Sequence, residues 1–167
     1  DLLAIGTKVE CYDNSNFAGK EAVGALTALV KTGTGWESDK NSYRKFIIKS
    51  APTQDDPRMM GEVVSRRLNH PEWPYPDLII IDGGLTQFRA AKAAAQKFKS
   101  ENLKFKIISY AKPHKMVYGM RDNDIPTPIF ELSKELRELI DSAIYQTHSF
   151  VIRFHRDKRS KLFIPEN

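Results

Sequence analysis

The first half of the chain alternates between short apolar runs and polar turns, a pattern typical of β-strands. Apolar runs predict strands over residues 7–13, 22–31 and 43–49. Residues 15–20 are polar and small and predict a loop, and residues 32–35 (TGTG) predict a tight turn. Short connections of this kind join antiparallel neighbours. We therefore expect three antiparallel strands before the first helix.

The second half alternates between helical and strand-like patterns. Residues 55–68 have an acidic start, Pro57 in the first turn and apolar residues at helical spacing, which together predict a helix. Residues 78–82 are apolar on both faces and predict a central parallel strand. The elements expected after these are a helix over 86–98, a strand over 106–111, a hairpin-like stretch over 116–130 and a long helix over 133–161.

The predicted order of elements, β-β-β-α-β-α-β-α, defines the fold class that we expect. It predicts an α/β domain with a mixed five-stranded sheet flanked by helices. A right-handed crossover would place the fourth strand beside the first. The length of 167 residues fits one domain, and residues 1–6 are interpreted as the end of a linker or of a preceding domain.

Two aspartates stand where apolar, strand-like runs end. Asp13 follows Val9–Tyr12, and Asp82 follows Leu78–Ile81. An ionised carboxylate beside a dry core must be paired or must bind a cation. If the two strands are parallel neighbours, both carboxylates meet at one edge of the sheet and suit Mg²⁺ or Mn²⁺. The alternative is that Asp13 caps a turn and that Asp82 caps the alanine-rich helix.

Other acidic residues could complete such a site. Asp55 and Asp56 begin a helix, where capping is the expected role, and Glu62 is expected on the solvated side of the same helix. Glu10 is expected to point to the sheet face opposite to Asp13, because side chains alternate along a strand.

Two histidines lie on one face of the last predicted helix, because His148 and His155 are seven residues apart. A histidine at this position could project over the strand ends and orient or deprotonate a water, or help to hold a metal. The alternative is that each histidine packs beside the sheet with a structural hydrogen bond.

Positive charge is concentrated at the C-terminal end. Residues 151–167 contain five basic and two acidic residues, which is +3 of a total net charge of +5. A basic patch favours a polyanion, nucleic acid first, although basic residues also suit the last turns of a helix. Gly83-Gly84 offers backbone N–H groups to an anion. The candidate phosphate contacts are Tyr43, Arg44, Lys112, Arg153, Arg156 and Arg159.

Composition excludes several other classes of protein. A hydrophobic content of 41% and a charged content of 28% are ordinary for a soluble domain. No apolar run is long enough to span a bilayer, and the first residues lack the features of a signal peptide. The single cysteine, Cys11, excludes an internal disulfide and a thiolate zinc site and fits a reducing cytoplasm. Dinucleotide and P-loop motifs are absent.

Five segments, taken together and in order, provide a family resemblance. They are VECYDNSNFAGKEAVGAL, SYRKFIIK, DDPRMMGEVVSRR, PDLIIIDGGLTQ and THSFVIRFHRDKR. In this order they resemble the C-terminal endonuclease domain of the UvrC excinuclease family. The resemblance implies a ribonuclease H-like fold. It also implies a metal-dependent cut of a DNA strand on the 5′ side of a lesion, in nucleotide excision repair.

The resemblance also implies roles for particular residues. Asp13 and Asp82 would bind Mg²⁺ or Mn²⁺, His148 would be a third member of the site, and Asp56 would be a further acidic member. The implied partners are damaged duplex DNA and UvrB-like and UvrA-like repair proteins, reached through modules absent here; no membrane partner is implied. Other positions that match family motifs are Tyr43, Arg44, Glu62, Arg66, Arg67, Gln87, Lys112, His155 and Arg156.

The chain departs from the family pattern around the histidine. The family usually has His where Asn16 stands, and Asp-Glu-x-His-Arg where this chain has YQTHS at residues 145–149. Residues 84–87 (GLTQ) replace a usual Gly-Lys-Gly-Gln. Because the two aspartates and the histidine are retained, we favour a divergent but active nuclease. The alternatives are a non-catalytic nucleic-acid-binding domain of the same fold and a nuclease selective for another DNA structure or for RNA.

Overall fold

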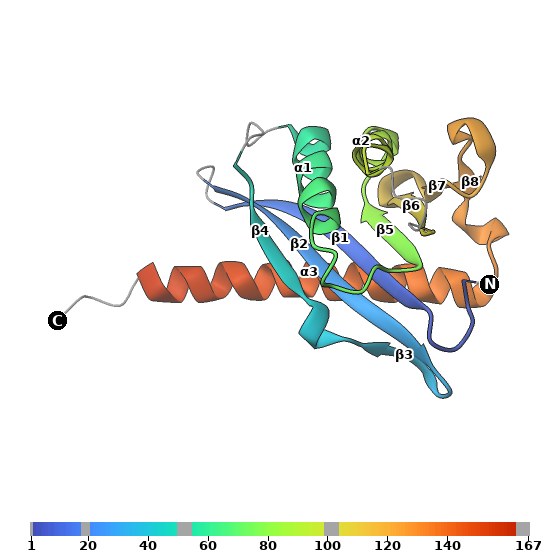
Figure 1. The fold of residues 1–167 in the computed structure, drawn as a ribbon, viewed down its shortest axis with the longest axis horizontal. Helices are drawn as coiled ribbons and strands as arrows, with labels where there is room; N and C mark the ends of the chain where they lie inside the picture. Colours follow the sequence, from blue (N-terminus) through green and yellow to red (C-terminus); the bar gives the residue numbers. More distant parts are fainter. Residues whose placement is uncertain (1, 18–20, 50–54, 99–103, 163–167) are drawn as a thin grey trace.

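The computed structural model describes residues 2–17, 21–49, 55–98 and 104–162. At its centre is one mixed sheet (Figure 1) with the spatial strand order β3-β2-β1-β5-β6-β7-β8, in which β4 also pairs with β2. The strands are β1 (Lys8–Phe17), β2 (Glu21–Thr32), β3 (Gly35–Ser38), β4 (Arg44–Ile47), β5 (Leu78–Asp82), β6 (Lys106–Ala111), β7 (Met116–Tyr118) and β8 (Thr127–Pro128). The α-helices are α1 (Asp56–Leu68), α2 (Leu85–Gln96) and α3 (Lys134–Leu162). The short 3-10 helices are η1 (Lys40–Ser42), η2 (Lys112–His114), η3 (Asp122–Asp124) and η4 (Ile129–Glu131).

Helices cover both faces of the sheet (Figure 1). α1 and α2 pack on one face, against a cluster that includes Tyr12, Ile79 and Ile81. α3 packs on the other face, against a cluster that includes Cys11 and Ile80. Because successive strand residues face opposite ways, β1 and β5 contribute alternate residues to the two clusters. These central strands are therefore buried on both sides, as the continuous apolar run of β5 predicted.

The predicted parallel pairing of the first strand with the fourth is confirmed. β1 and β5 are parallel neighbours, with Val9 opposite Leu78 and Tyr12 opposite Ile81. β6 continues the parallel order beyond β5, and β2 runs antiparallel to β1. The predicted mixed α/β arrangement is therefore confirmed.

The first strand is longer than predicted. β1 continues past Asp13 to Phe17, so the loop predicted at residues 15–17 is wrong. The rest of that loop, residues 18–20, lies outside the described residues. β1 stays in the sheet because its pairing with β2 continues until Phe17 stands opposite Glu21, and this pairing satisfies the polar backbone groups. Asp13 therefore marks the point where β1 leaves β5, not the point where β1 ends.

The sheet also has more strands than the predicted five. Eight strands belong to it within the described residues. β3, β7 and β8 have four residues or fewer, which leaves little alternation for a pattern to detect. Residues 43–49, predicted as one strand, form only Arg44–Ile47. β3 and β4 pair with different parts of the same strand, β2.

The three predicted helices are present, with small shifts at their ends. Asp55 caps α1 as predicted, and its Oδ1 accepts a hydrogen bond from the Arg58 N–H at 3.1 Å. α1 lies so close to β2 that a Cβ atom at Gly24 would stand 2.2 Å from Cγ2 of Val63. This contact requires glycine and sets the distance between α1 and the sheet. No helix within the described ranges is both long and apolar enough to cross a membrane.

β1 places a buried ion pair on the α1 face of the sheet. Glu10 is 1% exposed and accepts hydrogen bonds from Arg67 Nη2 at 2.8 Å and from the Tyr12 hydroxyl at 2.6 Å. Arg67 also donates to the Pro74 carbonyl oxygen at 2.9 Å. As predicted, Glu10 faces away from Asp13. Its charge is compensated inside the protein by a guanidinium group, so it has no part in the site on the other face.

Candidate active site

The two predicted aspartates lie together at the end of the parallel strand pair. Asp13 and Asp82 directly follow Tyr12 and Ile81, the last residues that pair between β1 and β5. By strand alternation, both side chains share the face of Cys11, which is covered by α3. The Asp13 side chain is only 15% exposed. Two carboxylates therefore stand side by side in a largely dry environment.

Burial and mutual repulsion both act on this pair. Burial first, and then the negative charges of Asp82 and Asp56, raise the pKa of Asp13 from 3.8 to about 7. Burial also raises the pKa of Asp82, and Lys112 and His148 offset part of that rise. Neighbouring carboxylates that resist joint ionisation are stabilised by a divalent cation.

Helix α3 brings His148 to the pair. Its Nδ1 lies 3.9 Å from Asp13 Oδ2, and its side chain is 65% exposed. This distance is too long for a hydrogen bond, so the imidazole faces both the carboxylate and the solvent. On the other side, Lys112 follows β6 directly and is close enough to Asp82 to lower its pKa. The site therefore combines two carboxylates, an imidazole and an ammonium group.

Asp56 approaches the pair from α1. It is the first residue of that helix, and its backbone carbonyl oxygen accepts a hydrogen bond from Asn14 Nδ2 at 3.2 Å. Its charge contributes to the raised pKa of Asp13. The capping role expected for the acidic pair belongs to Asp55. The structure therefore brings all four predicted catalytic residues to one end of the sheet.

The donor atoms of the site fit a cation that prefers oxygen ligands. Within the described part of the chain, no three His, Cys, Asp or Glu side chains already surround one point as metal ligands. Mg²⁺ does not require three protein ligands, because it keeps several waters and binds through one or two carboxylates plus substrate phosphates. Asp13 and Asp82 supply these two carboxylates. The fit is therefore to Mg²⁺ or Mn²⁺ and not to a closed zinc-type cage.

Glu62 is not part of this group. It accepts hydrogen bonds from the Lys49 N–H at 2.9 Å and from Arg66 Nη1 at 3.2 Å, and its side chain is 10% exposed. The expectation of a solvated helix residue is therefore wrong. The reason is that the segment after β4 lies against α1. There the Glu62 carboxylate accepts a hydrogen bond from the backbone N–H of Lys49.

The predicted anion site at the glycine pair is also used internally. The Gly83 N–H donates to the Tyr110 carbonyl oxygen at 3.2 Å, and the Gly84 N–H donates to Gln87 Oε1 at 3.1 Å. Gln87, one of the positions that match family motifs, thus holds the start of α2. These two amides point at protein acceptors, so the geometry does not present them to a ligand.

Arg44 lies on the opposite sheet face from the aspartates. Asp13 pairs with Ala25 and Ala25 pairs with Lys45, so Lys45 shares the face of Asp13. The Arg44 guanidinium lies 4.4 Å from the centre of the Trp73 ring. The structure therefore does not bring Arg44 together with the aspartates. Sequence reasoning missed Lys45, although strand alternation with the chosen Tyr43 would have identified it.

His155 is held by the hairpin of β1 and β2. Its Nε2 lies 2.6 Å from the Ser15 hydroxyl oxygen. Burial, and then the charge of Arg159, lowers the pKa of His155. His155 therefore matches the alternative of a histidine that packs beside the sheet with a structural hydrogen bond. His148, in contrast, has an exposed side chain beside Asp13.

Three other predicted phosphate contacts, Tyr43, Arg153 and Arg156, line two adjoining hollows beside the C-terminal half of α3, whereas Arg159 lines neither. The hollows measure about 380 Å³ and about 490 Å³, and Tyr43 and Arg153 line both. Arg156 lines only the first. Lys40 lines both hollows and Gln146 lines the first. Neither residue was predicted, because Lys40 belongs to η1 and Gln146 to α3, and only the tertiary structure brings these elements together.

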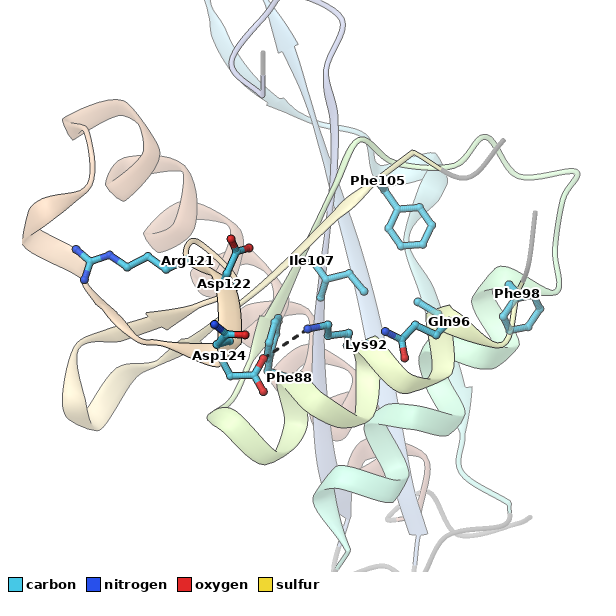
Figure 2. Close-up of a pocket in the computed structure, with 12 residues that line it drawn as sticks. Phe88, Lys92, Gln96, Phe98, Phe105, Ile107, Arg121, Asp122 and Asp124 are labelled. Carbon is cyan, nitrogen blue, oxygen red and sulfur yellow. Dashed lines mark ion pairs between the residues drawn. The ribbon is translucent and has the colours of Figure 1, made fainter. Parts of the chain in front are cut away.

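A further pocket, of about 390 Å³, lies between α2 and the segment that follows β7 (Figure 2). Phe88 and Ile107 line it, and Lys92 forms an ion pair with Asp124 at its rim, with 3.5 Å between Nζ and Oδ1. Gly119 has φ +88°, and a Cβ atom there would stand 2.4 Å from the Ile107 carbonyl oxygen. None of the predicted site residues lines this pocket, so it is separate from the aspartate site.

The fold and the site define a mixed α/β domain that gathers acidic side chains at the end of two parallel strands. Residues 1–160 match the family described as the UvrC RNAse H endonuclease domain. The chain belongs to this family, and the predicted resemblance and ribonuclease H-like fold class are confirmed.

Relatives and solved structures place this domain in context. The chain is 35% identical to the UvrABC system protein C of Desulforapulum autotrophicum, over 92% of this chain and 25% of the relative. It is 38% identical to that of Cytophaga hutchinsonii, over 96% and 26%. The chain thus spans about a quarter of the length of these curated relatives. Human ENDOV is similar at 16% identity and a TM-score of 0.43, over 71% of this chain and 50% of that structure.

Proposed function

We propose that this domain is a divalent-metal-dependent DNA endonuclease that hydrolyses a phosphodiester bond. The observation behind the proposal is the pair Asp13 and Asp82, which follow the last residues paired between β1 and β5. Burial and the charge of Asp82 raise the pKa of Asp13 to about 7. A structural role would pair these carboxylates with cationic side chains, as it does for Glu10.

Each residue has a distinct part in this proposal. Asp13 and Asp82 hold Mg²⁺ or Mn²⁺, which when bound polarises the phosphate and lowers the pKa of a bound water. His148 orients or deprotonates the attacking water, or completes the ligand shell of the metal. Asp56 adds negative charge beside Asp13, and Lys112 offers an ammonium group to a phosphate near Asp82. The basic residues of α3 hold the DNA backbone.

The wider biological role is proposed from the relatives. Those relatives are named UvrABC system protein C. We infer that the domain makes the 5′ incision near a lesion in nucleotide excision repair, in the cytoplasm. UvrB-like and UvrA-like proteins would deliver it to damaged duplex DNA through parts of a longer protein.

The test uses the domain joined to its partner modules and a lesion-bearing duplex labelled at one end. With Mn²⁺ or Mg²⁺, the parent protein is expected to release a single 5′-incision product, visible on a denaturing gel. Asp13→Ala and Asp82→Ala should abolish cutting while keeping the circular dichroism spectrum of the parent. Full cutting by either variant would contradict the proposed mechanism. An undamaged duplex and a matched RNA serve as substrates that separate the repair nuclease from a structure-selective or RNA-directed one.

A non-catalytic nucleic-acid-binding domain is the second candidate. Its support is the altered sequence around His148, where residues 145–149 read YQTHS, together with the exposed position of His148. This candidate predicts DNA binding by parent and Asp13→Ala protein alike, without a product at any Mn²⁺ concentration. The same gel and a filter-binding assay therefore distinguish the two candidates.

A further inference from the structure

The two hollows beside α3 adjoin one another and are together called the groove. Lys40, Tyr43 and Arg153 line both hollows, so these three side chains lie where the hollows meet. The lining residues come from η1 and β4 and from the C-terminal half of α3. The Tyr43 hydroxyl donates to Gln146 Oε1 at 2.9 Å, and its ring meets Phe150 edge-on at 5.2 Å. These contacts hold Tyr43 against α3 where the two hollows meet.

The lining of this groove is basic. Its cationic side chains come from η1, β4 and two successive turns of α3, and Asp157 is the one acidic residue among the described residues that line it. Lys45 extends over the Phe154 ring, with Nζ 4.4 Å from the ring centre, and both residues line the second hollow. A concave surface with this excess of positive charge favours a polyanionic backbone. The cations are Lys40, Lys45, Arg153 and Arg156.

One aromatic ring on the rim of the groove is largely exposed to solvent. Tyr145 lines the first hollow and is 72% exposed. It stands three residues before His148 on α3, which makes the two neighbours on the helix surface. His148 faces Asp13, whereas Gln146 and Phe150 face Tyr43 in the groove. Tyr145 therefore stands at the border between the groove and the candidate active site.

We propose that this groove binds a single-stranded segment of DNA that leads to the aspartate pair, with a nucleobase stacked on Tyr145. The chemistry fits because single-strand binders combine a basic groove for the backbone with aromatic faces for the bases. The bases of a duplex are already stacked on one another, so an exposed ring such as that of Tyr145 favours an unpaired strand. The inference rests on the proposed nucleic-acid function but not on cutting.

The test measures binding of a fluorescein-labelled oligothymidylate to the chain in EDTA, where no metal-dependent cutting occurs. Tyr145→Ala should weaken binding about fivefold to tenfold, and Tyr145→Phe should bind within about twofold of the parent, because stacking needs the ring and not the hydroxyl. The matched control is Phe130→Ala, since Phe130 lies outside the groove and is exposed to nearly the same extent, 71%. Control and parent should bind equally.

A second variant tests the backbone contacts. Removing two cations with Lys40→Ser/Arg153→Ser should reduce the slope of log K against log salt by about 1.4, at roughly 0.7 per phosphate contact on a single strand. Lys97→Ser/Lys134→Ser removes two exposed lysines outside the groove and should leave the slope unchanged.

Two outcomes would overturn the proposal. In the first, Tyr145→Ala binds the oligothymidylate as tightly as Phe130→Ala does. In the second, Tyr145→Ala loses as much affinity for a duplex of the same sequence as for the single strand. Neither depends on catalysis. If binding depends on Tyr145 but Asp13→Ala still cuts, the proposed mechanism fails and the groove stands. If Asp13→Ala is inactive but Tyr145→Ala binds like the parent, only the proposal of a single-strand groove fails.

Discussion

Strand β1 places two poorly exposed acidic residues on opposite faces of the sheet, and their surroundings differ in kind. Glu10 meets the Arg67 guanidinium and the Tyr12 hydroxyl. Asp13 meets a second carboxylate, Asp82, and no cationic side chain is closer to it than His148 at 3.9 Å among the described ion pairs. The first arrangement is complete without a ligand. The second arrangement would be completed by the divalent cation that we propose, so the comparison distinguishes a charge paired inside the protein from one that is left for a ligand.

The largest expected effect comes from breaking the complete pair. Arg67→Ala leaves Glu10 buried without a partner, so the free energy of unfolding should fall by about 3–5 kcal/mol. Urea denaturation followed by circular dichroism measures this loss. Arg58→Ala on the same helix is the control, because Arg58 forms an exposed pair with Asp55 and its loss should cost at most about 1 kcal/mol. Equal losses for the two variants would contradict a special role for the Glu10–Arg67 pair.

Neutralising Asp13 in the carboxylate pair should raise the free energy of unfolding, whereas Arg67→Ala lowers it. The folded pKa of Asp13, about 7, lies above its ordinary value of 3.8, so ionisation costs stability as pH rises from about 4 to above 7. Asp13→Asn should therefore increase the free energy of unfolding at pH 8, by on the order of 2–4 kcal/mol at about 1.4 kcal/mol per pKa unit. At pH 4 the gain should nearly vanish. A gain that is the same at both pH values would show that burial and repulsion do not act on this carboxylate.

A divalent cation should stabilise the parent protein through the same pair. At a concentration roughly ten times its dissociation constant, Mn²⁺ or Mg²⁺ should add about 1–2 kcal/mol. The measurement is the shift in Tm on titration at pH 8. Asp13→Asn and Asp82→Asn should show no saturable shift, while Arg66→Ala should respond like the parent. A full shift in Asp82→Asn would remove this residue from the metal site.

The smallest effect on stability is expected at His148. Its side chain is 65% exposed, so His148→Ala should change the free energy of unfolding by less than about 0.5 kcal/mol. The cutting rate should nevertheless fall by about 10²–10⁴, the range for loss of a general acid or base. If His148→Ala cuts at the parental rate, His148 has no catalytic role and only lies beside the site.

Much of the architecture followed from local patterns. The apolar runs of β2 and β5 and the capped start of α1 each have a short-range cause, so their positions were predictable within a few residues. The wrong predictions also have physical causes. β3, β7 and β8 are too short to show alternation, and β1 continues through polar residues because it pairs with β2.

The candidate site divides in the same way. The sequence shows that Asp13 and Asp82 each follow an apolar run, and a carboxylate in that position is costly and hence informative. It also shows His148 on the last predicted helix. The meeting of these three residues depends on the register of β1 against β5 and on the path of α3, which are set by pairing between distant segments. The same is true of Glu62, which binds the backbone after β4, and of the groove, whose lysines and arginines come from η1, β4 and α3. Residue chemistry is local, whereas proximity between elements far apart in the chain is decided only when the sheet and its helices pack.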